Sequence, residues 1–240
     1  MTHRHFHAVL TATILVFPSA LHAADQAAVS PQQSVQYEGK VTVRLNYLLS
    51  LPDGYEKQDA WPLLIFLHGS GERGSDIELV KKHGPPKLVD AGKKFPFIVV
   101  SPQCPKNQHW QASVLDGLLD DLQGKLKVDP KRIYLTGLSM GGQGTYSWAA
   151  LSKERFAAIV PICGRGDRTW GHRLAGLPTW IFHGVKDEAV PFSKSEQMVK
   201  ALKKAGAEPL FTVYPEAGHD SWTESYNNPK LYEWLLQQSR

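Results

Sequence analysis

The chain has 240 residues, 42% of them hydrophobic and 21% charged, with a formal net charge of +4. This composition excludes intrinsic disorder and is sufficient for one domain with a sizeable core. It also argues against nucleic-acid binding, because the lysine pairs at 81–82, 93–94 and 203–204 are scattered and form no basic run.

The N-terminus has the pattern of a secretory leader. Arg4 precedes an apolar stretch over 8–17, and Pro18 and small residues follow it. The stretch is too short to span a bilayer. We expect a signal peptide over 1–23, with an uncleaved anchor as the alternative, and a single domain over 24–240. Such a chain would be periplasmic or secreted and free of the membrane after cleavage.

Apolar, β-branched runs recur through the rest of the chain. From Leu63 onward they are nearly continuous in hydrophobicity, which indicates strands covered on both faces in a parallel sheet. Apolar residues at helical spacing follow Ser113, the expected N-cap of a helix. The same spacing recurs in a helix expected to end at Ala205-Gly206 and in another near the C-terminus. The expected strands lie at 41–49, 63–67, 97–100, 133–135, 157–162, 180–182 and 210–214.

This alternation of strands and helices predicts the α/β class, with a doubly wound, mostly parallel sheet flanked by helices. In such sheets ligands lie at the carboxyl ends of the strands. Only about 16 residues separate the strand ending near Ile162 from the one beginning at Thr179, so no large lid is expected there.

Two cysteines, Cys104 and Cys163, each follow a predicted strand. An oxidising compartment permits a bridge between them, but their strands need not be neighbours, and a bridge requires Cα atoms within about 7 Å. The sequence leaves a disulfide and two partly buried thiols as open alternatives.

The main functional signal is the run Gly137-Leu138-Ser139-Met140-Gly141, a G-x-S-x-G arrangement. The five-letter string alone is weak. Here it follows the strand at 133–135 and precedes a helix expected over 143–151, which is the strand–turn–helix setting of a nucleophilic serine. The flanking glycines fit a cramped corner, where larger side chains would collide with the neighbouring chain.

A serine nucleophile needs a base and a carboxylate, and both candidates follow in sequence. Asp187 comes after the strand at 180–182, and His219 after the strand at 210–214. The order Ser139, Asp187, His219 is that of an α/β-hydrolase triad. The competing carboxylates are Glu188, Asp220 and Asp167. His183 is interpreted as a brace for its loop by hydrogen bonding.

Negative charge on the reacting carbonyl oxygen would need fixed donors. The backbone amides of Met140 and Ser70 are the candidates, the second from the glycine-rich loop at 68–74. Trp110 and Trp222 follow strands and are candidate substrate-binding rings, with packing as the alternative. No histidine or cysteine grouping has metal-ligand spacing and no dinucleotide or phosphate motif is present, so no metal or cofactor is expected.

With these motifs assembled, the sequence over about residues 40–238 resembles the α/β-hydrolase superfamily. More narrowly it is similar to secreted esterases of the dienelactone hydrolase, feruloyl esterase and polyhydroxybutyrate depolymerase groups. The segments that carry the resemblance are PLLIFLHGSGERG, SPQCP, DPKRIYLTGLSMGGQGTY, FAAIVPICG, WIFHGVKDEAVP and YPEAGHDSW.

The resemblance implies that Ser139 is the nucleophile, Asp187 the acid and His219 the base, with the amides of Ser70 and Met140 as the oxyanion hole. Dienelactone hydrolases proper use a cysteine nucleophile, whereas this chain has a serine there. Simple esterase chemistry through an acyl-enzyme is therefore favoured.

The expected substrates are small or polymeric esters: acylated polysaccharide, aryl ester or short polyester. A serine peptidase of the same fold is the alternative, because the same groups cleave amides. A non-catalytic binding module on the same fold is a further alternative. Such a module would tolerate loss of a triad member, so the presence of all three favours an enzyme.

Overall fold

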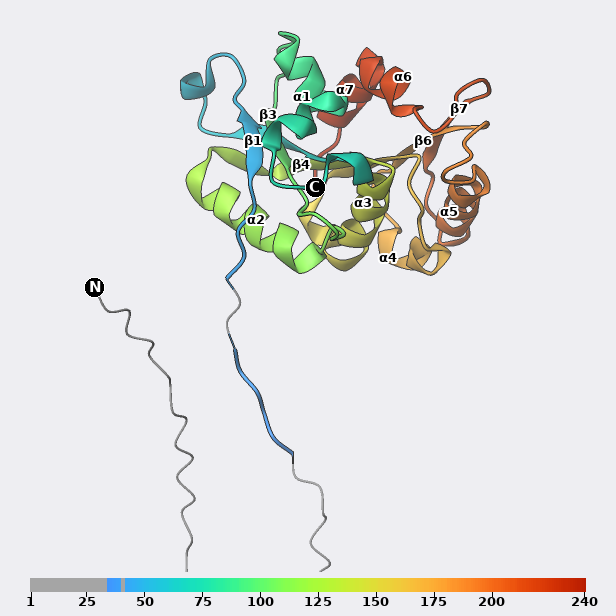
Figure 1. The fold of residues 1–240 in the computed structure, drawn as a ribbon, viewed down its shortest axis with the longest axis horizontal. Coiled ribbons are helices and arrows are strands. Elements are labelled where there is room, and N and C mark those ends of the chain that lie inside the picture. Colours follow the sequence, from blue (N-terminus) through green and yellow to red (C-terminus); the bar gives the residue numbers. More distant parts are fainter. Residues whose placement is uncertain (1–33, 40–41) are drawn as a thin grey trace, which may run out of the picture. The chain divides into compact units, whose positions relative to one another are not determined.

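The computed structural model describes residues 34–39 and 42–240 (Figure 1). The chain divides into two units, Met1–Val41 and Thr42–Arg240, and the described helices and strands all belong to the second. The expected signal peptide over 1–23 lies outside the described residues. Among the described residues, no helix combines the length and the apolarity needed to cross a membrane.

One seven-stranded sheet forms the centre of this unit, in the order β1-β3-β2-β4-β5-β6-β7. β1 runs antiparallel to β3, and the other neighbouring pairs are parallel, so the predicted mostly parallel sheet is confirmed. The strands are β1 Tyr47–Ser50, β2 Trp61–Leu67, β3 Ile98–Pro102, β4 Val128–Leu138, β5 Ala158–Ile162, β6 Trp180–Gly184 and β7 Leu210–Tyr214.

Helices cover both faces of the sheet. α2, α3, α4 and α5 lie on one face, and α1, α6 and α7 on the other (Figure 1). Short 3₁₀ turns, such as η2 Ser70–Glu72, lie in the connections. The helices are α1 Gly84–Asp90, α2 Ala112–Lys125, α3 Met140–Leu151, α4 Gly171–Leu174, α5 Ser193–Lys204, α6 Trp222–Asn227 and α7 Pro229–Leu236.

The interior strand β2 explains why the apolar runs of the sequence are continuous. Every residue of β2 is buried, and alternate side chains enter the two cores: Leu63 and Ile65 on the α2–α5 face, Leu64 and Phe66 on the other. Burial of each such side chain contributes about 1.5–3 kcal/mol. A strand with apolar side chains on both faces has no stable position at the surface.

Several predicted boundaries need correction. The strand expected over 41–49 begins only at Tyr47, because its partner β3 ends at Pro102, which pairs with Tyr47. Ser113 is not an N-cap, since α2 begins at Ala112 with no capping side chain. The helix expected over 143–151 begins three residues earlier, directly after the serine. The stop at Ala205-Gly206 is confirmed by the end of α5.

The corner between β4 and α3 brings backbone against backbone. A Cβ on Gly137 would lie 2.4 Å from the Gly141 carbonyl oxygen, and a Cβ on Gly141 would lie 1.8 Å from the Leu67 carbonyl oxygen. Real Cβ atoms do not approach backbone atoms so closely. The strands β2 and β4, which carry Leu67 and Gly137, cannot move aside because they are packed inside the sheet. The two flanking glycines of the motif are therefore required by packing.

Gly141→Ala should destabilise the fold by about 3 kcal/mol or more, because its methyl group would overlap the carbonyl oxygen of Leu67. Gly117→Ala is the matched control: Gly117 is exposed within α2, and its Cβ would meet no atom within 4 Å. The control should gain roughly 0.5–1 kcal/mol from reduced backbone entropy. Urea unfolding of both variants measures this, and equal stabilities would contradict the packing argument.

Candidate active site

Ser139 occupies the sharp corner between β4 and α3. Its backbone has φ 52° and ψ −115°, a conformation that costs a non-glycine residue about 1–3 kcal/mol. Its N–H donates to the carbonyl of Ile162 at the end of β5, at 3.0 Å. The surrounding sheet therefore holds the serine in a geometry that an isolated chain would not adopt.

His219 lies in the loop between β7 and α6 and joins the serine to a carboxylate. Its Nε2 is 2.9 Å from Ser139 Oγ, and its Nδ1 is 2.8 Å from Asp187 Oδ2. Because a carboxylate only accepts, Nδ1 carries the proton of the neutral ring and Nε2 presents its lone pair to the serine hydroxyl. The structure thus brings together the three residues singled out in the sequence.

Asp187 is buried and fully hydrogen-bonded. Its Oδ1 accepts the amides of Ala189 and Val190, at 2.9 and 2.8 Å, while its Oδ2 is shared by His219 and His183. Both carboxylate oxygens are thus held by hydrogen bonds from fixed groups. None of the rival carboxylates of Glu188, Asp220 and Asp167 has a described hydrogen bond to the His219 ring.

His183 braces this carboxylate, in agreement with the sequence interpretation. Its Nε2 lies 3.0 Å from Asp187 Oδ2 and 2.9 Å from the carbonyl oxygen of Val190, and its Nδ1 lies 2.6 Å from Ser195 Oγ. Burial lowers the pKa of His183, which favours the neutral ring. With Nε2 as donor, Nδ1 accepts from the hydroxyl of Ser195.

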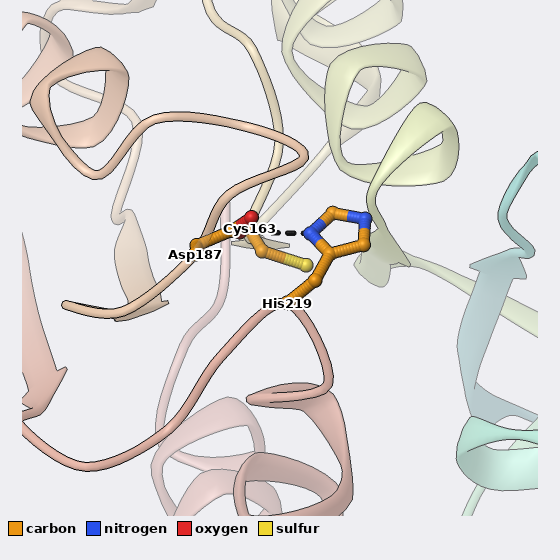
Figure 2. A group of neighbouring side chains, drawn as sticks. All are labelled: Cys163, Asp187 and His219. Carbon is orange, nitrogen blue, oxygen red and sulfur yellow. Dashed lines mark hydrogen bonds and ion pairs between the residues drawn. The ribbon is translucent and has the colours of Figure 1, made fainter.

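Cys163 lies beside the same pair (Figure 2). Its sulfur, an oxygen of Asp187 and a ring nitrogen of His219 lie within 4.8 Å of one another, a grouping that the sequence spacing did not reveal. Burial raises the pKa of the Cys163 thiol to about 12, so the thiol is protonated at neutral pH and opposes metal binding. Cys104 and Cys163 are both free and buried, which decides against the disulfide.

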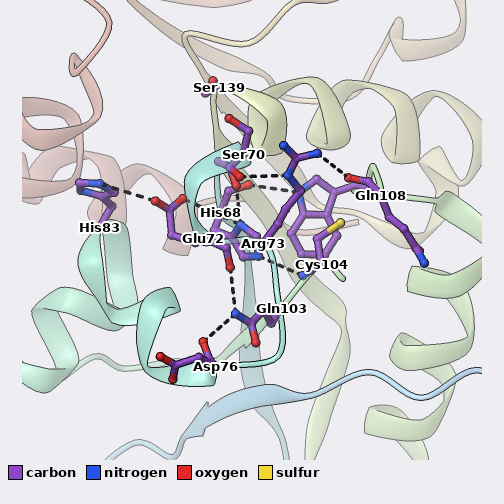
Figure 3. Close-up of polar contacts among 12 residues, drawn as sticks. His68, Ser70, Glu72, Arg73, Asp76, His83, Gln103, Cys104, Gln108 and Ser139 are labelled. Carbon is purple, nitrogen blue, oxygen red and sulfur yellow. Dashed lines mark hydrogen bonds and ion pairs between the residues drawn. The ribbon is translucent and has the colours of Figure 1, made fainter. Parts of the chain in front are cut away.

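The loop after β2 passes directly against the serine. A Cβ on Gly69 would lie 3.7 Å from Ser139 Cβ, and Ser70 lies next to Ser139 (Figure 3). Ser70 begins the turn η2, and Met140 begins α3. The first N–H groups of a helix have no acceptor within it. These are the two amides that the sequence proposed as oxyanion donors.

His68 and Trp110 fix the start of this loop. His68 Nε2 accepts the N–H of Cys104 at 3.0 Å, and Trp110 donates its indole N–H to the His68 carbonyl at 3.1 Å. The Trp110 ring also packs on the His68 ring, with centroids 4.9 Å apart. Trp110 therefore packs against the loop, whereas the Trp222 ring lies beside the His219 ring, with centroids 5.2 Å apart. A role of either ring in substrate binding stays a prediction.

Arg73 and Gln103 fix the rest of the loop (Figure 3). Arg73 Nε donates to the carbonyl of Ser70 at 3.0 Å. The buried amide of Gln103 donates to the carbonyls of Glu72 and Asp76, at 2.9 and 2.7 Å. Nothing local in the sequence shows which carbonyls such long side chains reach, so sequence reasoning did not find the role of Arg73.

The sheet is mostly parallel, and Ser139 lies on the sharp turn between the central strand β4 and α3. This arrangement is the α/β-hydrolase fold. The chain belongs to the dienelactone hydrolase family, which it matches over residues 103–231. Probable feruloyl esterase C of Aspergillus niger is 23% identical over 79% of this chain and 73% of that protein. The chain is a carboxylic ester hydrolase of this family.

Two further relatives share only part of their length with this chain. A solved thermostable esterase superposes with a TM-score of 0.73 at 33% identity, over 82% of this chain and 60% of that one. The bifunctional acetylxylan esterase/xylanase of Neocallimastix patriciarum is 28% identical over 58% of this chain, which spans 21% of that enzyme.

The pH dependence of stability tests the environment of His68. Burial lowers the pKa of His68 from 6.5 to about 4. The unfolded chain therefore gains the proton first, and the free energy of unfolding falls as the pH drops from 6.5 to about 4, by about 3 kcal/mol.

Between pH 7 and pH 4 the free energy of unfolding should fall by about 3 kcal/mol less in His68→Gln than in the native chain, as measured by urea unfolding. His172→Gln, at an exposed site on α4, is the control and should follow the native curve. Parallel curves for the native chain and His68→Gln would show that the acid loss arises elsewhere.

Proposed function

We propose that Ser139 is the nucleophile of this esterase, with His219 as general base and Asp187 as the carboxylate that orients it. The observation that supports this most strongly is the continuous hydrogen-bonded series from Ser139 Oγ through His219 to Asp187. A hydroxyl within 2.9 Å of an imidazole lone pair is within the range for proton transfer.

In the proposed reaction His219 Nε2 takes the proton of Ser139 as Oγ attacks the ester carbonyl carbon. The negative charge that develops on the carbonyl oxygen faces the amides of Ser70 and Met140, and such donors are each worth about 10²–10³ in rate. His219 then returns the proton to the leaving alcohol. Water attacks the acyl-enzyme by the same route and releases the acid.

Asp187 does not itself take up the proton. Its ionised carboxylate holds the Nδ1–H tautomer of His219 and stabilises the imidazolium that forms in each half-reaction. The amides of Ala189 and Val190 and the ring of His183 keep this carboxylate fixed without competing for the Nε2 side of His219.

For the substrate we propose an ester of a bulky or polymeric partner, such as acylated polysaccharide, aryl ester or short polyester. The names of the feruloyl esterase and acetylxylan esterase relatives support this class. The segment between β5 and β6 contains only the 3₁₀ turn Arg168–Trp170 and the four-residue α4, which leaves no large lid in that connection.

We also propose that the chain is exported to the periplasm or secreted, on the leader pattern of its first 23 residues. N-terminal sequencing of exported protein should then begin at Ala24. A mature protein that retains the leader would contradict this proposal.

Ser139→Ala should lower kcat by about 10⁴-fold or more, because no other described hydroxyl is hydrogen-bonded to His219. Ser147→Ala is the matched control, because Ser147 lies on the helix that follows Ser139 and its hydroxyl donates only to the Gly144 carbonyl among the described residues. Hydrolysis of acetyl, feruloyl, hydroxybutyryl and peptide substrates would be compared for each protein. Full activity of Ser139→Ala would refute the mechanism, and cleavage of peptides alone would favour the peptidase.

A further inference from the structure

The positive charge of the chain is concentrated on two neighbouring segments. Residues 165–175, which contain η5 Arg168–Trp170 and α4, carry together with α5 seven Lys or Arg and two Asp or Glu. Their net charge of +5 exceeds the +4 of the whole chain, so the remainder is close to neutral. Basic residues that are scattered in the sequence are therefore gathered by the fold into one region.

The two segments border a groove of about 640 Å³, and α4 and α5 lie side by side there (Figure 1). Gly171 and Ala201 bring the two backbones together, because a Cβ on Gly171 would lie 2.7 Å from the Ala201 carbonyl oxygen. The volume is within the range of ligand sites, roughly 300–1,000 Å³. We call this the basic groove, and its polar lining residues are Arg168, Thr169, His172, Gln197, Lys200 and Lys204.

The cations of the basic groove have no acidic partner. None of the described residues that line the groove is an Asp or a Glu. Arg168, Lys200 and Lys204 take part in none of the ion pairs between described residues. Asp167 precedes Arg168 in the chain, but its carboxylate accepts the amide and the hydroxyl of Thr169. The three positive charges therefore face the groove without compensation from its lining.

Two of these cations share one face of α5. Lys200 and Lys204 are four residues apart, and like charges at this spacing destabilise a helix. The helix dipole favours a cation in the last turn, which accounts for Lys204 but not for Lys200 or for Arg168 on the other side of the groove. The arrangement is unfavourable in the free protein and becomes favourable when an anion occupies the groove.

The shape and lining of the groove indicate which anion fits. The groove is concave, which suits a polymer chain better than a flat membrane surface. Its described lining contains no Phe, Tyr or Trp, so nucleic-acid bases would lack a ring for stacking. Thr169 and Gln197 lie among the cations, and the Gln197 carbonyl oxygen needs a donor. A sugar chain with carboxylates supplies both anions and hydroxyl donors, whereas polyphosphate supplies anions alone.

We propose that the basic groove binds a linear polysaccharide that carries carboxylate groups, of the uronic-acid class. Arg168, Lys200 and Lys204 face the carboxylates of this polymer. Thr169 and Gln197 hydrogen-bond its hydroxyl groups. The segments that form the groove contain none of the three proposed catalytic residues. Binding in the groove is therefore separate from ester hydrolysis and goes beyond the proposed function.

Calorimetric titration of the full chain with an oligogalacturonate of ten sugars tests this, at an ionic strength of about 0.15 M. The native chain should bind it with a Kd below about 1 mM and should not bind maltodecaose, a neutral sugar chain of the same length. The triple variant Arg168→Gln/Lys200→Gln/Lys204→Gln should raise this Kd at least about tenfold, because it removes the charges that face the carboxylates.

The matched control is Lys57→Gln/Lys106→Gln/Lys131→Gln, which removes the same net charge at exposed positions outside the groove. Its Kd should stay within about twofold of the native value, because distant surface charges are screened. Both triple variants should unfold cooperatively in urea and should hydrolyse a small acetyl ester at the native rate.

Absence of binding by the native chain would overturn the inference, and so would equal weakening in both triple variants or equal binding of maltodecaose. Equal or tighter binding of polyphosphate, single-stranded DNA or phosphatidylglycerol vesicles, at equal charge concentration, would overturn it in favour of another anion. If the groove variant does not unfold cooperatively, the comparison of Lys200→Gln with Lys106→Gln decides. Failure of the native chain to hydrolyse any ester would refute the proposed function and leave the binding result standing.

Discussion

The site depends on the contact between the first turn of α3 and the carboxyl ends of β2 and β5, where backbone meets backbone. Gly141 approaches the carbonyl of Leu67 and Gly142 approaches that of Ile162 so closely that a Cβ would lie at 1.8 and 2.6 Å. This contact fixes the direction of α3 and holds Ser139 in its strained conformation. The strain is tolerated because two buried cores fix the strands on either side.

The second half of the site is organised around Asp187. The Asp187 carboxylate lies in the loop after β6 and accepts a hydrogen bond from the amide of Ala189 in the same loop. It also bonds His183, which lies on β6, and His219, which lies after β7. One charge therefore sets the geometry of two connections and the tautomer of the proposed base. The protonated Cys163 thiol fills the space beside this pair without adding a competing charge.

The sheet and the grouping of Ser139 with His219 followed from the sequence, because continuous apolar runs and the order of loops determine which strand ends meet. The sequence could not show that Glu72 is buried while Glu224 is exposed, since both are glutamates in polar segments. It also could not show that Trp110 packs beneath the loop at 68–76. Such features depend on long-range packing, in which each side chain takes its role from segments distant in the chain.

Covalent labelling is the most direct test of the proposal that Ser139 forms the acyl-enzyme. A fluorophosphonate reacts with an activated serine, and tandem mass spectrometry locates the adduct. We expect one adduct per native chain, on Ser139, with loss of esterase activity in proportion to labelling. An adduct on another residue, or complete labelling of Ser139 with activity retained, would contradict it.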